Sequence, residues 1–205
     1  MQQIVLVVAL LIAGAAVLGL IQRRARARAS ADLAQAAALA GLSFDPDGSP
    51  EPLPQFRLFL DPRHPKTTRH QIRDDAEGVA VFEFDASTSQ WGSYRFSCAV
   101  ATLPFTSPRM SISWRSTLGR RRAVSRLDDA YDVDVDDTAF AERMLDAPVV
   151  EWFIALVRSH GRFRPRIEVL DDRLLVMCDP LDATHSVDLL RRTIDVRNRL
   201  ARTQA

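Results

Sequence analysis

An uncharged apolar segment near the amino terminus constrains this chain more than any other feature of its sequence. Ile4–Ile21 (IVLVVALLIAGAAVLGLI) is a run of 18 residues without a charged side chain. As a helix rising about 1.5 Å per residue, the run would extend roughly 27 Å, close to the ~30 Å hydrocarbon core of a bilayer. A helix is required there, because lipid offers no partners to backbone N–H and C=O groups. The run therefore predicts a transmembrane helix.

A basic flank follows the apolar run at once. It consists of Arg23, Arg24, Arg26 and Arg28, and no Lys or Arg precedes the run. By the positive-inside rule such a flank stays in the cytoplasm, which predicts a single-pass signal anchor and a cytoplasmic carboxyl-terminal domain. A cleaved signal peptide would carry its positive charge before the apolar run, and a buried core helix would show a polar face. The four arginines are also candidate contacts for lipid headgroups.

The sequence divides into four parts. They are a transmembrane anchor with its basic flank (1–28), a juxtamembrane helix (29–42), a proline-rich linker (43–55) and a soluble domain (56–205). The second part follows from Ser30–Leu42 (SADLAQAAALAGL), which favours helix and contains Gly41 as a C-terminal stop. The third part follows from the four prolines of Asp45–Gln55, which exclude a continuous helix.

Short segments of alternating polarity follow the linker. In Arg109–Arg115 (RMSISWR) every second residue is apolar, a period of two that is typical of a half-buried strand. No helical pattern separates the first of these segments, which favours a mainly antiparallel sheet of about six to eight strands. The predicted strands are Phe56–Leu60, Val79–Asp85, Tyr94–Val100, Arg109–Arg115, Tyr131–Val135, and a hairpin of Arg166–Leu170 with Arg173–Cys178 around Asp171 and Asp172.

Helical patterns dominate the later part of the chain. Asp137 or Thr138 can cap a short helix with an apolar stripe, and Val149–Ser159 predicts a second short helix after Pro148. The stretch Asp182–Arg199 predicts an amphipathic helix at the carboxyl end. The expected fold class is therefore α+β, an N-terminal transmembrane helix followed by a sheet that these helices cover.

The order of these segments resembles a known group of proteins. An uncharged span, an arginine cluster, the helix ending ALAGLSF and the strand VAVFEFD occur in succession, and DDTAFAERMLDAPVVEWF and IEVLDDRLLVM follow later. In this order the chain is similar to a loose group of uncharacterised single-pass, membrane-anchored proteins of high-GC bacteria. The resemblance implies the architecture above. It implies no activity and no functional residue.

The chain lacks the sequence patterns of common catalytic and metal sites. Asp132, Asp134 and Asp136 match the first ligands of an EF-hand loop, but Asp137 stands where glycine is needed and Arg143 where glutamate is needed. Phosphate-binding and nucleophile-elbow motifs do not occur. We therefore expect no catalytic residue, metal or cofactor, and the pattern favours a non-enzyme without deciding the question.

The four histidines and two cysteines are assigned structural positions. His64 and His70 are expected as exposed side chains in a loop, and His185 as a local hydrogen-bond partner of Asp182. None of the histidines has the spacing of a metal site. Cys98 and Cys178 are expected as reduced thiols in the core.

A second basic cluster occurs further along the chain. Arg120, Arg121, Arg122 and Arg126 follow Gly119 in a predicted loop and are candidate contacts for an anion. Nucleic acid is a poor fit, because no aromatic residues are interleaved there and acidic residues outnumber basic ones outside the anchor flank.

Two functional hypotheses are consistent with this sequence. The first is a membrane-tethered interaction module that binds another envelope protein or anionic lipid at the inner leaflet. The alternative is a cryptic enzyme or small-ligand-binding domain with a pocket between sheet and helices. A homo-oligomer stays open, because small residues recur four apart in the anchor, as at Ala15 and Gly19.

Overall fold

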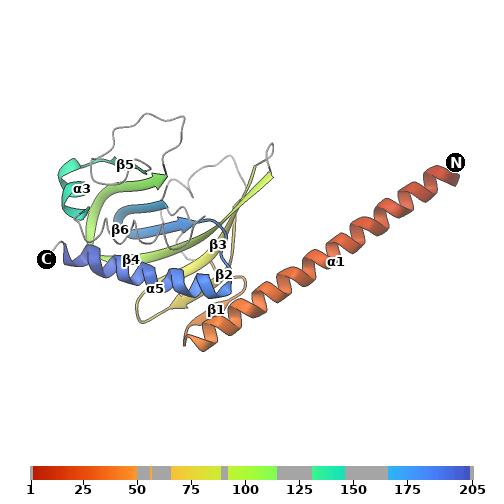
Figure 1. The fold of residues 1–205 in the computed structure, drawn as a ribbon, viewed down its shortest axis with the longest axis horizontal. Coiled ribbons are helices and arrows are strands. Elements are labelled where there is room, and N and C mark those ends of the chain that lie inside the picture. The colour runs from red at the N-terminus through yellow and green to blue at the C-terminus, as the bar shows by residue number, and fades with distance from the viewer. Residues whose placement is uncertain are drawn as a thin grey trace.

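The protein has an α+β fold in which helices pack on an antiparallel sheet of six strands. A computed structural model of the chain describes residues 2–49, 56, 66–88, 92–114, 131–145 and 166–203, with side chains from Ala13 onward except at some strand ends. In this part the sheet curls beneath one carboxyl-terminal helix, while the amino-terminal helix projects away from the domain (Figure 1). The predicted fold class, α+β with a mainly antiparallel sheet, is confirmed.

Helix α1 is a single uninterrupted helix, Gln2–Leu39. It ends in a Schellman motif, in which Leu42 donates its N–H to the carbonyl of Ala37 (2.9 Å) and Gly41 donates to that of Ala38 (3.1 Å). Gly41 adopts φ +73°, the left-handed conformation that this motif needs. The predicted stop at Gly41 is therefore confirmed, and the helix continues without a break from residue 28 to residue 29.

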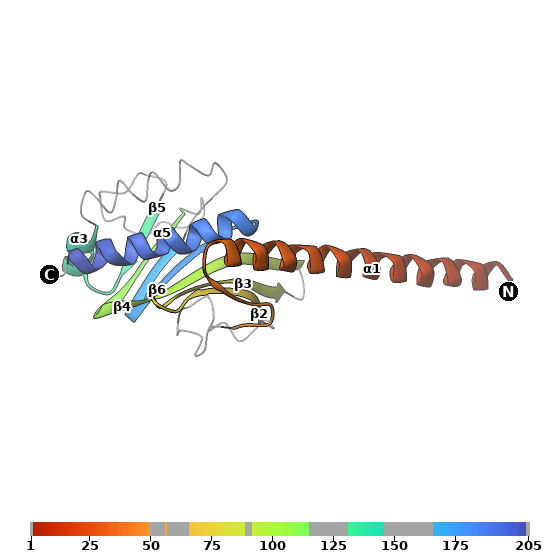
Figure 2. The same cartoon turned by 90° about the horizontal axis from the view of Figure 1, so that it is seen from below.

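Only the last turns of α1 pack against the domain. Leu33 and Ala37 are buried in the core, while residues 13–28 are exposed with the single exception of Gly19, so this part of the helix projects away from the domain (Figure 2). Among the described side chains, which start at Ala13, no helix has a stretch that is both long and apolar enough to cross a membrane. Residues 4–12 of the predicted span lie outside the described side chains.

The first three strands form a meander. Strands β1 (Ser43–Asp45), β2 (Lys66–Asp74) and β3 (Val79–Thr88) pair antiparallel in that order. The prediction of β3 is confirmed. Residues 43–45 were expected in the linker and the segment around His70 in a loop, and both expectations are wrong. Polar β2 has Ile72 as its one large apolar side chain, so it carries little of the hydrophobic alternation that indicates a strand.

Strand β4 (Gly92–Trp114) is the centre of the sheet. It pairs with β3 through Gly92–Ala101 and, further along, with β5 (Tyr131–Val135) through Met110–Trp114. The two strands predicted at Tyr94–Val100 and Arg109–Arg115 are thus parts of one strand. The prediction of β5 is confirmed.

Strand β6 (Arg166–Cys178) runs antiparallel to β4 over Ser97–Ile112. The predicted hairpin within this segment is wrong, because both halves of β6 pair with β4 and not with each other. Asp171 takes a positive φ of 52°, the conformation of a turn residue, but it lies opposite Ser107 where the β4–β6 register shifts. The local turn signal therefore bends the strand and does not reverse it.

The helices after β5 match the sequence well. Helix α3 (Thr138–Met144) is capped by the side chain of Asp137, and helix α5 (Ala183–Arg202) by that of Asp182. The predicted helix Val149–Ser159 and all of the predicted strand Phe56–Leu60 except Phe56 lie outside the described residues.

Each face of the sheet carries its own hydrophobic cluster. The larger cluster joins the sheet to α1, α3 and α5, with Leu33, Phe140 and Leu190 among its members. The second cluster lies on the other face, because its residues alternate along β3, β4 and β6 with those of the first. Phe82 and Phe84 belong to it.

Replacing Leu33 by alanine should loosen the attachment of α1. Leu33 is 5% exposed and Leu39, on the same helix, is 82% exposed. We expect Leu33→Ala to lower the free energy of unfolding by about 2–3 kcal/mol, since it removes a buried side chain and leaves a cavity. Leu39→Ala, the matched control, should change it by less than about 0.5 kcal/mol. Urea titration of the detergent-solubilised full chain measures both, and equal effects would contradict the packing described.

Candidate functional site

A groove runs between α1 and α5. It consists of two successive hollows of about 450 and 460 Å³ that share Ala36, Leu39 and Thr184. We call this feature the α1–α5 groove. The first hollow is lined by Ala29, Asp32, Leu33, Gln35, Ala36, Leu39, Glu83, Leu181, Asp182, Ala183 and Thr184, and the second by Ala36, Leu39, Ala40, Thr184, His185, Val187, Asp188 and Arg191.

Alanine on α1 explains why the groove is open. Ala29, Ala36 and Ala40 face it, and their methyl groups are too short to fill the space between the two helices. The helices contact each other directly beside the groove (Figure 2). Leu39 stands at the junction of the two hollows with 82% of its surface exposed.

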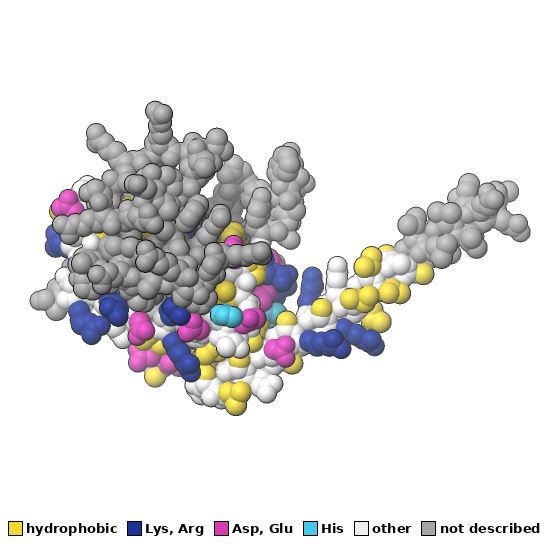
Figure 3. Space-filling model, viewed as in Figure 1, with side chains coloured by type: hydrophobic (Ala, Val, Ile, Leu, Met, Phe, Trp, Pro, Cys, Tyr) yellow, Lys and Arg dark blue, Asp and Glu magenta, His cyan; other side chains and the backbone are white. Residues whose placement is uncertain are grey.

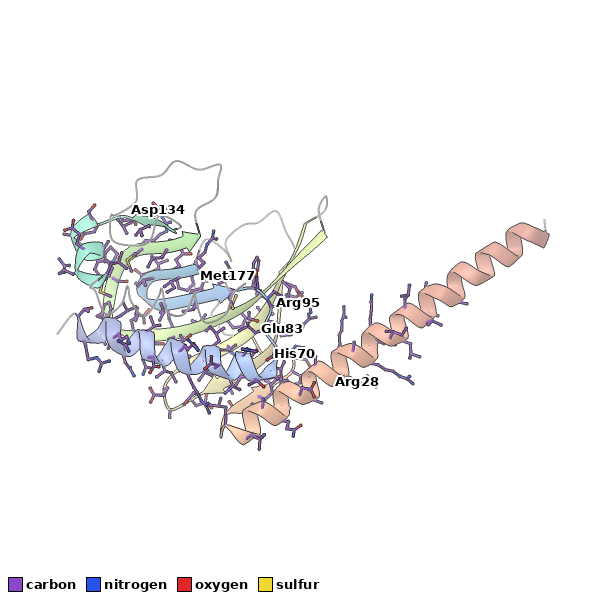
Figure 4. The ribbon with its side chains drawn as sticks, viewed as in Figure 1. Arg28, His70, Glu83, Arg95, Asp134 and Met177 are labelled. Carbon is purple, nitrogen blue, oxygen red and sulfur yellow. The ribbon has the colours of Figure 1, made fainter. Side chains whose placement is uncertain are left out.

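A network of charged residues lies where the first hollow meets the sheet. Glu83 of β3 accepts a hydrogen bond from Nε of Arg69 (2.9 Å) and lies 3.3 Å from Nδ1 of His70 (Figure 4). The Arg69 guanidinium also reaches Asp85 (2.8 Å), which accepts a second hydrogen bond from Arg95 (3.0 Å). The network thus links three neighbouring strands through alternating charges.

A β-bulge directs His70 into this network. The β2–β3 register shifts between Arg69 and Ile72, and His70 takes φ 55° there. Its N–H donates to the carbonyl of Pro46 (2.9 Å), and its ring stacks on Phe44 at 6.3 Å between centroids. The side chain is 10% exposed, so the expected exposed imidazole in a loop is wrong.

The amino end of α5 borders the first hollow. Asp182 accepts hydrogen bonds from the backbone N–H of His185 (2.9 Å) and lies 2.8 Å from Nδ1 of the same residue. The hydrogen bond from that N–H holds the pKa of the Asp182 carboxyl below its usual value. The local hydrogen bond predicted between these two residues is confirmed.

A second polar cluster surrounds Arg109 on β4. Its guanidinium lies 3.0 Å from Asp134, 3.9 Å from Asp136 and 3.5 Å from Glu168, whose side chain is only 4% exposed. Two of the aspartates that resemble calcium ligands in the sequence are thus paired with an arginine. We interpret the cluster as structural, because it neutralises a carboxylate buried in β6.

The two cysteines are buried where the sequence placed them. Both are free thiols, Cys98 in the second hydrophobic cluster and Cys178 in the larger one. Burial raises the pKa of both thiols far above the usual value, which keeps them protonated.

One of the two predicted arginine clusters lies in the described part of the chain. Arg23, Arg24, Arg26 and Arg28 are exposed on the projecting part of α1, between its exposed apolar stretch and the domain (Figure 3). Arg28 directly precedes Ala29, which lines the groove (Figure 4). The other candidates, Arg120, Arg121, Arg122 and Arg126, lie outside the described residues.

The sequence did not identify the groove or the network beside it. Asp32, Glu83 and His70 come from parts of the chain that were assigned to separate elements or to a loop. Glu83 and Asp85 alternate on β3, which is a usable signal for cross-strand ion pairs. That signal has meaning only once β2 is recognised as the neighbouring strand.

Comparison with known proteins identifies a shared fold. No protein-family model matches the chain, and no curated protein matches it by sequence. It is similar to the crystal structure of the mycobacterial trehalose monomycolate transport factor A, TtfA, with a TM-score of 0.57 and 13% identity. The match covers 85% of this chain and 95% of the other. This likeness shows a shared fold, and the resemblance to uncharacterised anchored proteins stays a prediction.

Removing the Asp182 carboxylate should weaken α5 in a pH-dependent way. A carboxyl whose pKa is lowered by folding stabilises the protein above its unfolded pKa, and this stabilisation disappears as the pH falls through the folded pKa. We expect Asp182→Ala to cost about 1 kcal/mol at pH 7, as for other N-cap losses. The difference from the parent chain should shrink below about pH 4. Urea titrations at pH 7 and below about pH 4 measure this difference in unfolding free energy. The control is Asp195→Ala, on the exposed surface of α5.

Removing Arg109 alone should cost more stability than removing both members of its pair with Glu168. Arg109→Ala leaves Glu168 uncompensated in the core, and we expect a loss of about 3 kcal/mol in unfolding free energy. Combining Arg109→Ala with Glu168→Leu should recover part of that loss, since the unpaired buried charge is gone. Denaturant titration of the parent chain, Arg109→Ala and the double variant gives the three free energies of unfolding. A double variant less stable than Arg109→Ala would show that the cluster has a different role.

Proposed function

We propose that this chain is a membrane-tethered interaction module. The apolar run crosses the bilayer, the basic flank stays at the inner leaflet, and the α+β domain binds another envelope protein or anionic lipid there. The observation that carries the proposal is that α1 extends without interruption from Gln2 to Leu39, and its last turns belong to the core of the domain.

This continuity supports a rigid connection between bilayer and domain. Leu33 lies five residues after Arg28, which corresponds to about 7.5 Å along a helix. The last arginine of the flank and the first buried contact of the domain are therefore less than two turns apart. A domain held in this way samples few orientations, so even a weak affinity for a membrane-bound partner becomes effective.

The exposed basic flank supports contact with lipid headgroups. All four arginine side chains are exposed on α1. Each basic residue near an anionic membrane surface contributes about 1 kcal/mol. The flank therefore orients the anchor and adds to membrane affinity at the same time.

The structural neighbour agrees with a role at the cell envelope. That protein is a mycobacterial trehalose monomycolate transport factor. The shared fold supports an envelope-associated function for this chain as well, and we transfer no substrate.

The described structure gives less support to a ligand pocket between sheet and helices. The side chains through which α5 faces the sheet are buried and mostly apolar, with Val187, Leu190 and Val196 among them. The concave space in the described part of the chain lies beside α5, in the α1–α5 groove, and Glu83 is its one lining residue from the sheet.

Fractionation and protease protection test the proposed function. We expect the full chain to leave membranes only with detergent, and its carboxyl-terminal domain to resist protease outside intact cells. Replacing Arg23, Arg24, Arg26 and Arg28 by alanine should produce a mixed orientation, because the positive-inside bias is lost. Replacing the exposed Arg191 and Arg202 of α5 should leave the orientation unchanged. A soluble chain, or a domain digested from outside in the parent protein, would refute the proposal.

A further inference from the structure

We propose that the α1–α5 groove binds a juxtamembrane segment of a neighbouring membrane protein, one that is basic and carries a leucine-sized apolar side chain. The inference rests on the proposed function, because it takes the groove to lie at the cytoplasmic surface of the bilayer. It adds the place on this chain where such a partner binds and the chemistry by which it is recognised.

The groove begins where the basic flank ends. Its first lining residue, Ala29, follows Arg28 directly, and its last on α1 is Leu39, just before Ala40. Ten residues of helix correspond to about 15 Å. One wall of the groove is thus the anchor helix itself, so a segment that leaves the bilayer beside α1 would run along it.

The membrane-proximal hollow carries negative charge. Asp32, Glu83 and Asp182 line it, and no basic residue is among its described lining residues. Asp32 is exposed and makes no hydrogen bond or ion pair with the described part of the chain, so its charge is available to a partner. Glu83 is paired with Arg69 and Asp182 with His185, so Asp32 supplies the uncompensated negative charge of this hollow.

The negative charge of the membrane-proximal hollow favours basic segments among those found at an inner membrane surface. Cytoplasmic segments close to a membrane span carry an excess of Lys and Arg. Carboxylates at the near end of the groove complement such a segment and repel the anionic headgroups that the arginine flank attracts. The flank and the groove therefore have opposite charge preferences within a few residues of one helix.

The distal hollow supplies apolar contact. Leu39 is 82% exposed and lines this hollow together with Ala36, Ala40 and Val187. A partner that places a leucine-sized side chain here would cover this surface, as in helix-in-groove recognition. Asp188 and Arg191 at the margin are of opposite sign, so the distal hollow has no strong charge preference.

Site-specific photocrosslinking in intact cells tests the inference. We would place p-benzoylphenylalanine at Gln35, which lines the first hollow, in the full chain. Mass spectrometry should map the adducts to basic segments within about 20 residues of a membrane span in another protein. Asp32→Lys should reduce the adduct yield about fivefold, as expected for an ion pair replaced by repulsion. The matched Asp195→Lys, on exposed α5 surface beyond the groove, should leave the yield unchanged.

Several results would overturn the inference. Adducts on this chain itself, on a second copy, on lipid alone or on soluble proteins would each do so, as would no adduct or a yield insensitive to Asp32→Lys. If fractionation also shows a chain that is not anchored with its domain in the cytoplasm, the proposed function fails with it. If the anchor and orientation hold, only the assignment of the groove is wrong.

Discussion

The pairing of β4 with three other strands is the interaction on which the described domain depends. Its first part lies between β3 and β6, and its last part between β5 and β6. Every strand of the meander is connected to the rest through it. Pro104 and Pro108 fall within the irregular part of the β4–β6 register, where a residue without N–H costs no ladder hydrogen bond. The irregularity lets one strand curve and serve both regions of the sheet.

The second constraint is the continuity of α1. A flexible linker after the basic flank would let the domain rotate freely, whereas a helix transmits its direction into the core through Leu33 and Ala37. The Schellman motif at Gly41 then turns the chain back into β1. The end of α1 is thereby fixed between α5 and the first two strands, with which it makes its contacts.

Local signals in the sequence predicted the elements whose stability is local. The Asp137 cap, the amphipathic α5 and the alternation in β5 all matched the structure, because each depends on neighbours within a few residues. Strand β2 was missed because cross-strand ion pairs from Arg69 stabilise it, and these need residues of β3. The sequence correctly indicated a turn-like backbone at Asp171 but wrongly predicted that the chain reverses there. Only the pairing of both halves of β6 with β4 shows that the strand continues. The groove could not be predicted, because it exists only where two distant helices meet.

The composition of α1 links its two roles. Alanine is the strongest helix former, and the run of alanines after the basic flank keeps the helix intact between the apolar segment and the domain. The same side chains have little volume, so α1 packs into the core at Ala37 but leaves space beside Ala29, Ala36 and Ala40. Larger residues at those positions would fill the groove and increase the buried area. If α1 served only as a rigid connector, larger side chains at these positions would stabilise it against α5. The small side chains are therefore better explained if the groove binds a partner.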